Sequence, residues 1–516
     1  MSNSATLNIK DELSRLPGVG NVTVFGAGQY SMRVWLDPNK LQALSLMPQD
    51  VIQAIQQQSQ QVTAGQVGMP PAPPGQAFQY TLNINGRLDD TKEFENVIVK
   101  TGNNGDVTRV RDVGRVELGA QTYSQIFSLN NKPATGIGVF QSPGANALEV
   151  EQAVRKKMDA LARGFPQDMK FDIPFDTTKF VSASIHEVYK TLIEAGFLVL
   201  VVILVFLQDW RAMLVPATTV PVTIIGAFAA MAALGFTINL STLFAIVLAI
   251  GIVVDDAIVV VEGAAHNIEQ GMSGHDAAIK AMDQLFGPII GITLVLVSVF
   301  LPAAFLPGMT GRIYAQFALV IAATALISAI NAATLKPTQC ALWLRRPVPP
   351  EKRNWFYRGF NAIYGKLESR YAALISRMVA HSGFSVILAL ILIGIGGYGL
   401  SRVPTGFIPI EDQGYLLAAV QLPDGASLDR TQRVLDQVTE MTGKTPGVAQ
   451  VISIAGISAL DNSSSLASAG VSYLILKDWD KRGPGEDLRS LVIGLNKKLE
   501  AIPEARILVI PPPPIQ

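Results

Sequence analysis

The stretch Leu248-Ala-Ile-Gly-Ile-Val-Val-Asp-Asp-Ala-Ile-Val-Val-Val-Glu262 places two adjacent carboxylates, Asp255 and Asp256, inside an otherwise apolar run. A charge at the centre of a bilayer costs on the order of 3 kcal/mol on insertion scales. Two neighbouring carboxylates cannot both ionise easily there, so at least one is expected to hold a proton. A proton carrier needs such a pair, and the stretch therefore predicts a proton-driven membrane pump.

The composition divides the chain into membrane and exported regions. Of its 516 residues, 49% are hydrophobic and only 16% are charged, against about 25% charged in average proteins. Lys+Arg and Asp+Glu balance at 41 each, so no basic surplus indicates a nucleic-acid partner. Crossing about 30 Å of hydrocarbon takes about 20 residues. The apolar stretches long enough to do so lie at 189–207, 213–234, 240–262, 285–306, 313–344 and 384–402.

Positive residues between the spans predict the orientation. Three loops carry ten Lys and Arg residues, whereas the two loops on the other side carry only Arg312. The positive-inside rule places the basic loops in the cytoplasm, so both flanking regions are expected outside it. An exported region before the first span needs a signal, yet residues 1–10 contain no apolar segment. We therefore expect the chain to be part of a longer protein with at least one earlier helix.

A pattern repeats in the two exported regions. In each, a helical run ends at Pro-Gly and an alternating strand begins, at 16–25 and at 445–454. A late amphipathic helix, a proline and another strand follow. This order predicts a split βαβ fold with its helices on one face of a sheet. The late helices are expected at 150–164 and 488–501, and the strands after them at 169–173 and 507–510.

The first copy is much longer than the second, which indicates an insertion. We place the insertion at 37–126. It contains a Gln-rich helix at 51–61 and a loop at 68–75 whose Pro and Gly residues cannot continue a helix or sheet. Composition alone does not show whether the insertion is an interaction surface or a long connection.

These motifs together resemble a known family. The stretch from Gly251 to Glu262 is similar to the signature helix of the resistance–nodulation–division (RND) efflux transporters, in the hydrophobe/amphiphile branch of Gram-negative bacteria. The resemblance covers essentially the whole chain. Further motifs agree, namely Pro174-Phe-Asp-Thr-Thr178, Ser184-Ile-His-Glu-Val188, Phe206-Leu-Gln-Asp-Trp210, Phe236-Thr-Ile-Asn239 and Phe407-Ile-Pro-Ile-Glu-Asp-Gln413.

The resemblance implies a membrane α-helical bundle, with six of twelve expected helices, plus α+β periplasmic porter subdomains of the split βαβ, ferredoxin-like type. It assigns each region a role. The expected regions are a porter subdomain at 1–36 and 127–186, a docking insert at 37–126, five transmembrane helices in 187–344, a cytoplasmic amphipathic segment at 345–383, a sixth helix at 384–403 and an incomplete second porter subdomain at 404–516.

The resemblance also implies a function. The chain would belong to a proton/drug antiporter of the bacterial inner membrane, with Asp255 and Asp256 as the proton relay and no cofactor beyond the proton-motive force. Such pumps are homotrimers that work with a periplasmic adaptor and an outer-membrane channel. The basic partner of the acid pair would come from helices of the other half of the protein. Lys336, which precedes Pro337 deep in its span, is expected to snorkel to the cytoplasmic surface.

The strand at 22–25 bears on the cargo. Side chains alternate along a strand, so Val22 and Val24 face one way while Thr23 and Phe25 face the other. The residues themselves leave open whether Phe25 packs in the core of its own sheet and helix. The resemblance implies that Phe25 lines a deep aromatic pocket for drug-like amphiphiles, with Thr23, Tyr123 and Gln125 beside it. Thr23 and Gln125 differ from the residues of well-known relatives, which leaves the substrate range open.

Other classes of function fit less well. A heavy-metal exporter of the same superfamily would have an acid at the position of Ala249 and Gly at that of Asp256. An exporter of lipids or other amphiphiles remains the alternative within the superfamily. An enzyme would need a nucleophile, metal or nucleotide motif, and the sequence has no G-x-S-x-G, H-E-x-x-H or Walker motif.

Overall fold

The computed structural model describes residues 1–513 apart from 61–64, 72–74, 76, 83–85, 103–104, 347–353, 404–409 and 462. The chain forms two compact units. One contains Met1–Thr178 and Ile408–Gln516, and the other contains Lys179–Phe407. Each unit is described by itself below.

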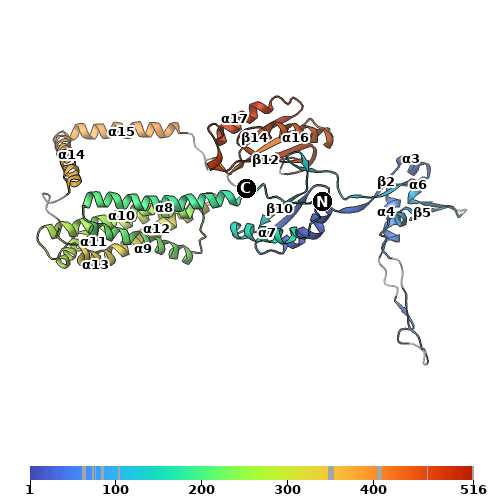
Figure 1. Ribbon diagram of the computed structural model, residues 1–516, viewed down its shortest axis with the longest axis horizontal. Helices are drawn as coiled ribbons and strands as arrows, with labels where there is room; N and C mark the ends of the chain where they lie inside the picture. The colour runs from blue at the N-terminus through green and yellow to red at the C-terminus, as the bar shows by residue number, and fades with distance from the viewer. Residues whose placement is uncertain are drawn as a thin grey trace. The chain divides into compact units, whose positions relative to one another are not determined.

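The second unit is helical, and its described residues contain six helical stretches long and apolar enough to cross a membrane, as predicted from the sequence; the fifth stretch runs over α12 and α13. Several helices begin at a side-chain cap: the Asn239 side chain accepts a hydrogen bond from the Thr242 amide at the start of α10. The helices of this unit are α8 (Thr178–Leu207), α9 (Trp210–Ala233), α10 (Leu240–Glu269), α11 (Gly274–Phe300), the 3₁₀ turn η2 (Leu301–Phe305), α12 (Gly308–Ala333), α13 (Leu335–Trp343), α14 (Trp355–Ala380) and α15 (Ser382–Arg402) (Figure 1).

Helix α10 occupies the middle of this unit and is the most buried of the spans. It packs against α9, α11 and α12, and small residues on its surface let the neighbours approach closely. Ala245, Ala249, Ala257 and Ala264 are all buried there. Residues on either side of the acid pair are thus held in a packed core. None of the residues of α14 or α15 is buried within this chain.

The second porter region, from β11 to β14, has the order β-α-β-β-α-β and the strand order β14-β11-β13-β12, which is the arrangement of a split βαβ sheet. Sequence reasoning missed β11, although its apolar run was the available signal. Helices α16 and α17 cover one face, where Leu435, Leu491 and Leu474 belong to one core. The elements are β11 (Tyr415–Gln421), α16 (Leu428–Gly443), β12 (Val448–Ile457), β13 (Ser465–Leu476), η4 (Trp479–Lys481), α17 (Leu488–Leu499) and β14 (Arg506–Ile510).

Two short strands from the first part of the chain extend this sheet beyond β12. Strand β8 (Ile126–Leu129) pairs antiparallel with β12, and β9 (Lys132–Pro133) follows it. In this ladder Phe127 lies opposite Ile454. The two porter regions therefore share a continuous sheet, which sequence reasoning did not anticipate.

The first porter region is built on a two-stranded sheet of β1 (Val19–Phe25) and β10 (Gly136–Gln141), packed against α7 (Ala147–Ala162). The chain before β1 forms α1 (Ser2–Ser4), the π-helix η1 (Ala5–Lys10) and α2 (Asp11–Ser14). The predicted strand at 169–173 is wrong, because it has no ladder partner among the residues described here. Phe171 instead packs as a side chain into the core around Leu13 and Met158.

The inserted region has its own small core around Leu41, Val51 and Val110. Strands β2 and β7 pair with each other, and side chains of β2 pack against this core. The loop expected at 68–75 lies partly outside the described residues. The elements are β2 (Tyr30–Leu36), α3 (Pro38–Ala43), α4 (Pro48–Gln58), β3 (Gln66–Val67), β4 (Tyr80–Thr81), α5 (Thr91–Glu95), β5 (Ile98–Thr101), β6 (Val107–Arg109), α6 (Val110–Val113) and β7 (Gly114–Ala120).

Candidate functional site

The acid pair lies in the middle of α10, and its two members have different surroundings. Neighbours on a helix project about 100° apart. Asp256 is 7% exposed and faces the core of the helix bundle. Asp255 lies on an exposed face of the same helical unit. The pair therefore offers one carboxyl group to the interior of this unit and one to whatever covers its outer face.

Asp256 is held by a hydroxyl from the neighbouring helix. The Oγ atom of Ser328 on α12 donates a hydrogen bond of 2.6 Å to Oδ2 of Asp256. Ser328 itself is fully buried. A hydrogen bond to a carboxylate in a buried place is short and stronger than one between neutral groups. Ser328 therefore fixes the orientation of the Asp256 carboxyl group toward α12.

Further polar side chains join α9 to α12 and α13. The amide Nδ2 of Asn331 donates to Oγ1 of Thr223 at 3.2 Å. The amide Nε2 of Gln339 donates to Oγ1 of Thr218 at 2.9 Å. Buried polar groups inside a membrane bundle must find such partners, because lipid offers none. Together with Asp256 and Ser328, they form a buried polar seam through an otherwise apolar bundle.

Lys336 does not snorkel, contrary to the expectation from sequence. Its side chain is fully buried, and its Nζ atom has no hydrogen-bond partner within the described part of the chain. The reason is local. Thr334, with φ −118° and ψ −64°, interrupts the helix between α12 and α13, and α13 packs against α9, α10 and α11. The break turns Lys336 into the bundle instead of along the span to its end.

A second candidate site lies where the two porter regions meet. Val22 and Val24 belong to the core between β1 and α7, as the alternation predicts. Phe25 instead packs with Ile454 and Phe127, so it lies outside its own sheet–helix core. The rings of Phe25 and Phe127 stack with centroids 6.4 Å apart. Sequence reasoning missed Phe127, and only its apolar strand-like setting beside Gln125 could have indicated it.

The other residues expected at the pocket are spread over its neighbourhood. Thr23 is half-buried in β1 opposite Gly138, and Gln125 is half-buried directly before β8. Tyr123 is 53% exposed, with the Arg33 guanidinium 4.9 Å from its ring centroid. Its hydroxyl accepts a hydrogen bond from the Ala120 amide. The contacts of Tyr123 are thus with the strands of the insert.

Three further aromatic residues extend the wall on which Phe25 packs. Phe175 lies 5.3 Å from Tyr473 and 4.7 Å from Tyr415, measured between ring centroids. Burial raises the pKa of the Tyr473 hydroxyl, because the phenolate is poorly solvated there. The face of the sheet opposite α16 and α17 is therefore lined by aromatic and branched aliphatic side chains. Such a wall gives large contact area with few directional demands.

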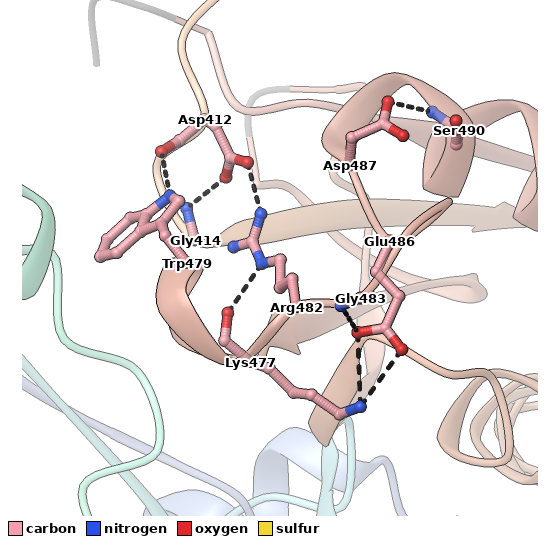
Figure 2. A network of polar contacts seen from close by, with 9 residues as sticks. All are labelled: Asp412, Gly414, Lys477, Trp479, Arg482, Gly483, Glu486, Asp487 and Ser490. Atoms are coloured by element: carbon pink, nitrogen blue, oxygen red, sulfur yellow. Dashed lines mark hydrogen bonds and ion pairs between the residues drawn. The ribbon is translucent and has the colours of Figure 1, made fainter.

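A polar network fastens the start of the second porter region (Figure 2). Arg482, whose side chain is 6% exposed, forms an ion pair with Asp412. Its Nε atom also donates to the Lys477 carbonyl at 2.8 Å, and the indole nitrogen of Trp479 donates to the Asp412 carbonyl at 3.1 Å. Asp412 also accepts a hydrogen bond from the amide of Gly414, the residue directly before β11. The network thus joins the residues directly before β11 to the residues directly after β13.

Glu486 and Asp487 continue the same network (Figure 2). Lys477 pairs with Glu486 at 3.3 Å. Asp487 begins α17 by accepting a hydrogen bond from the Ser490 amide at 3.0 Å. Hydrogen bonds from Ser490 lower the pKa of Asp487, because they stabilise its carboxylate. Figure 2 shows that the contact of Asp487 with Ser490 is separate from the hydrogen bonds and ion pairs that link Asp412, Arg482 and Glu486.

A family model described as the AcrB/AcrD/AcrF family matches residues 1–516. The chain is 42% identical over 498 residues to the multidrug export protein AcrF of Escherichia coli (strain K12), covering 96% of this chain and 48% of that protein. It is 40% identical over 491 residues to the multidrug resistance protein MdtF of the same strain, covering 94% and 47%. It is 38% identical over 525 residues to the multidrug/solvent efflux pump membrane transporter MepB of Pseudomonas putida, covering 100% and 49%. The chain spans about half the length of the curated relatives it matches.

Proposed function

The chain belongs to the AcrB/AcrD/AcrF family of RND efflux transporters, and on that premise we propose that it forms part of a proton/drug antiporter. The observation that carries this proposal is Asp256, a carboxyl group 7% exposed inside a membrane bundle and hydrogen-bonded to Ser328. In such a place the charged form of a carboxyl group has a much higher free energy than the protonated form. The uptake and release of a proton can therefore drive movement of the helices. The relatives are named as multidrug and solvent exporters, which supports the same reading.

In this mechanism Asp255 and Asp256 form the proton relay. Protonation removes the charge of Asp256 and weakens its hydrogen bond from Ser328, so α10 and α12 lose an electrostatic contact. The helices then shift, and the porter regions open or close the pocket beside Phe25. Drug-like amphiphiles are the proposed cargo, because the wall with Phe25 and Phe127 is aromatic and apolar. Thr23, Tyr123 and Gln125 are the proposed neighbours of that pocket.

The proposed setting is the inner membrane of a Gram-negative bacterium, with both porter regions in the periplasm. The family resemblance supports a homotrimer that works with a periplasmic adaptor and an outer-membrane channel. The strands and helices from β2 to β7 form a separate core and are the proposed docking insert. The exposed face of Asp255 fits a basic partner from the other half of the transporter, since the chain spans about half of its relatives.

The test is dye accumulation in efflux-deficient Gram-negative cells that carry the full-length gene product and its adaptor. The wild type should lower accumulation, and Asp256→Asn at equal membrane expression should not. Asp283→Asn, an exposed acid on α11, is the matched control and should behave as the wild type. Equal export by Asp256→Asn would refute the coupling role. Transport of lipids without any dye phenotype would favour the lipid-exporting branch.

A further inference from the structure

Lys336 is a charged residue that the proposed mechanism has not used. It has no exposed surface, and no described residue accepts a hydrogen bond from its Nζ atom. An ammonium group removed from water without a partner is strongly disfavoured, so such a lysine needs a nearby negative charge or must give up its proton. The surroundings of Lys336 therefore decide what it does.

The helix break places Lys336 beside the end of α12. That helix ends at Ala333, and α13 begins at Leu335. The last carbonyl groups of a helix carry a partial negative charge that attracts a cation, but this effect is small compared with a full charge. Pro337 follows within the first turn of α13 and has no amide hydrogen to donate. Lys336 itself lies in the first turn of α13, where the partial positive charge of a helix start disfavours a cation, so a carboxylate is still required.

Asp256 lies on α10, against which α13 packs, and both Asp256 and Lys336 are buried. Within the described residues, Asp256 is the acid whose charge acts on Lys336, and the uncharged Cys340 thiol lies on the lysine's own helix. The neighbouring helices α9, α11 and α12 contribute no other charged group to it in the part of the chain described here. Asp256 also reaches Ser328. The acid, the hydroxyl and the amine are thus buried on α10, α12 and α13, three helices that pack against one another.

We propose that Lys336, which belongs to the same helical unit, supplies the positive charge with which Asp256 pairs after Asp256 has released its proton. This inference rests on the proposed antiport. When Asp256 takes up a proton from water, the attraction between its carboxylate and the Lys336 ammonium group is lost. The interruption at Thr334 then lets α13 move relative to α10. Lys336 is thus a positioning residue for the acid and a link between protonation and helix movement.

The test uses the full-length gene product in membranes and the carboxyl reagent dicyclohexylcarbodiimide, which reacts with protonated carboxyl groups in apolar surroundings. Labelling of Asp256 is followed by mass spectrometry of its peptide over a range of pH. Lys336→Met removes the charge and keeps the length of the side chain, whereas Lys336→Arg keeps the charge. Lys366→Met, an exposed lysine on α14, is the matched control. Dye export by each variant is measured in parallel.

We expect Lys336→Met to label several-fold faster than the wild type at neutral pH and to lose most dye export. Lys336→Arg and Lys366→Met should stay close to the wild type in labelling. Unchanged labelling of Asp256 in Lys336→Met would overturn the inference, even if export fell, because a merely structural role would not alter the charge state of Asp256. If the wild type labels as expected but exports no dye, the proposed cargo fails while the pairing of Lys336 with Asp256 is still decided by the labelling.

Discussion

Phe127 of β8 lies opposite Ile454 of β12 in an antiparallel ladder, although the membrane helices separate the two strands in the sequence. The same Phe127 ring stacks on Phe25 of β1. One aromatic side chain therefore contacts both porter regions. Any movement of one region against the other must change the surroundings of this ring, which makes Phe127 a sensitive position for cargo binding.

The first prediction concerns this aromatic pair. Phe127→Ala should weaken export of bulky aromatic dyes by up to about tenfold, because such a pair contributes about 0.5–1.5 kcal/mol beyond its buried area. Small polar substrates should be less affected. Dye efflux rates from preloaded cells measure the difference. Phe286→Ala, on α11 and 51% exposed, is the control and should leave the rates unchanged.

Gly136→Ala tests the same pair from the other side. A Cβ atom at Gly136 would collide with the ring of Phe127. The ring must therefore move away from Phe25, and the substrate profile should change in the same direction as in Phe127→Ala. A wild-type profile in a well-expressed Gly136→Ala variant would contradict the assignment of this wall to the pocket.

The second prediction concerns the hydroxyl beside the buried acid. Ser328→Ala removes a hydrogen bond to a charged group, which contributes about 1.5–3 kcal/mol. Proton-driven dye export in proteoliposomes should fall by about tenfold or more at an unchanged gradient. Ser328→Thr keeps the hydroxyl and should retain most activity. Thr324→Ala lies one turn earlier and removes a hydroxyl that bonds only to Val320 of its own helix; it should have little effect.

The third prediction concerns the ion pair of Asp412 and Arg482. Arg482→Met should destabilise the start of the second porter sheet by about 2 kcal/mol, because it leaves the partly buried Asp412 without its charged partner. Hydrogen exchange of β11 and β13 in the purified transporter measures the change. The control is Arg430→Met, whose pair with Glu504 is 3.8 Å long and exposed on both sides; it should cost less than about 1 kcal/mol. Equal exchange in both variants would contradict the fastening role.

The fourth prediction concerns alkaline pH. Burial raises the pKa of Tyr473 in the folded protein above its unfolded value of about 10. A raised folded pKa means that the stabilising contribution is complete below the unfolded pKa and is lost as pH rises through the folded pKa. The porter sheet should therefore lose stability above about pH 10. Tyr473→Phe should remove this part of the pH dependence, as measured by hydrogen exchange of β13 at several pH values.

The sequence alone determined the membrane part of this protein. Six long apolar stretches predicted six spans, and all six form helices, because in lipid a backbone can satisfy its hydrogen bonds only within a helix or a closed barrel. The adjacent acids in Leu248–Glu262 likewise indicated which helix carries a buried carboxyl group. The family resemblance that these motifs carried is confirmed over the whole chain. The local sequence was sufficient to predict these helices, because lipid leaves the backbone few other conformations.

Tertiary structure decided which partner each side chain meets. The same apolar run predicts a helix but not that Asp256 turns to Ser328 while Asp255 faces outward. The pattern around Lys336 and Pro337 predicted snorkelling, and packing of a broken helix buried the lysine instead. Nor did alternation along Val22–Phe25 show that β8 crosses to a distant sheet and brings Phe127 to Phe25. Periodicity fixes the face of an element, whereas the opposing residue depends on long-range packing that no local pattern encodes.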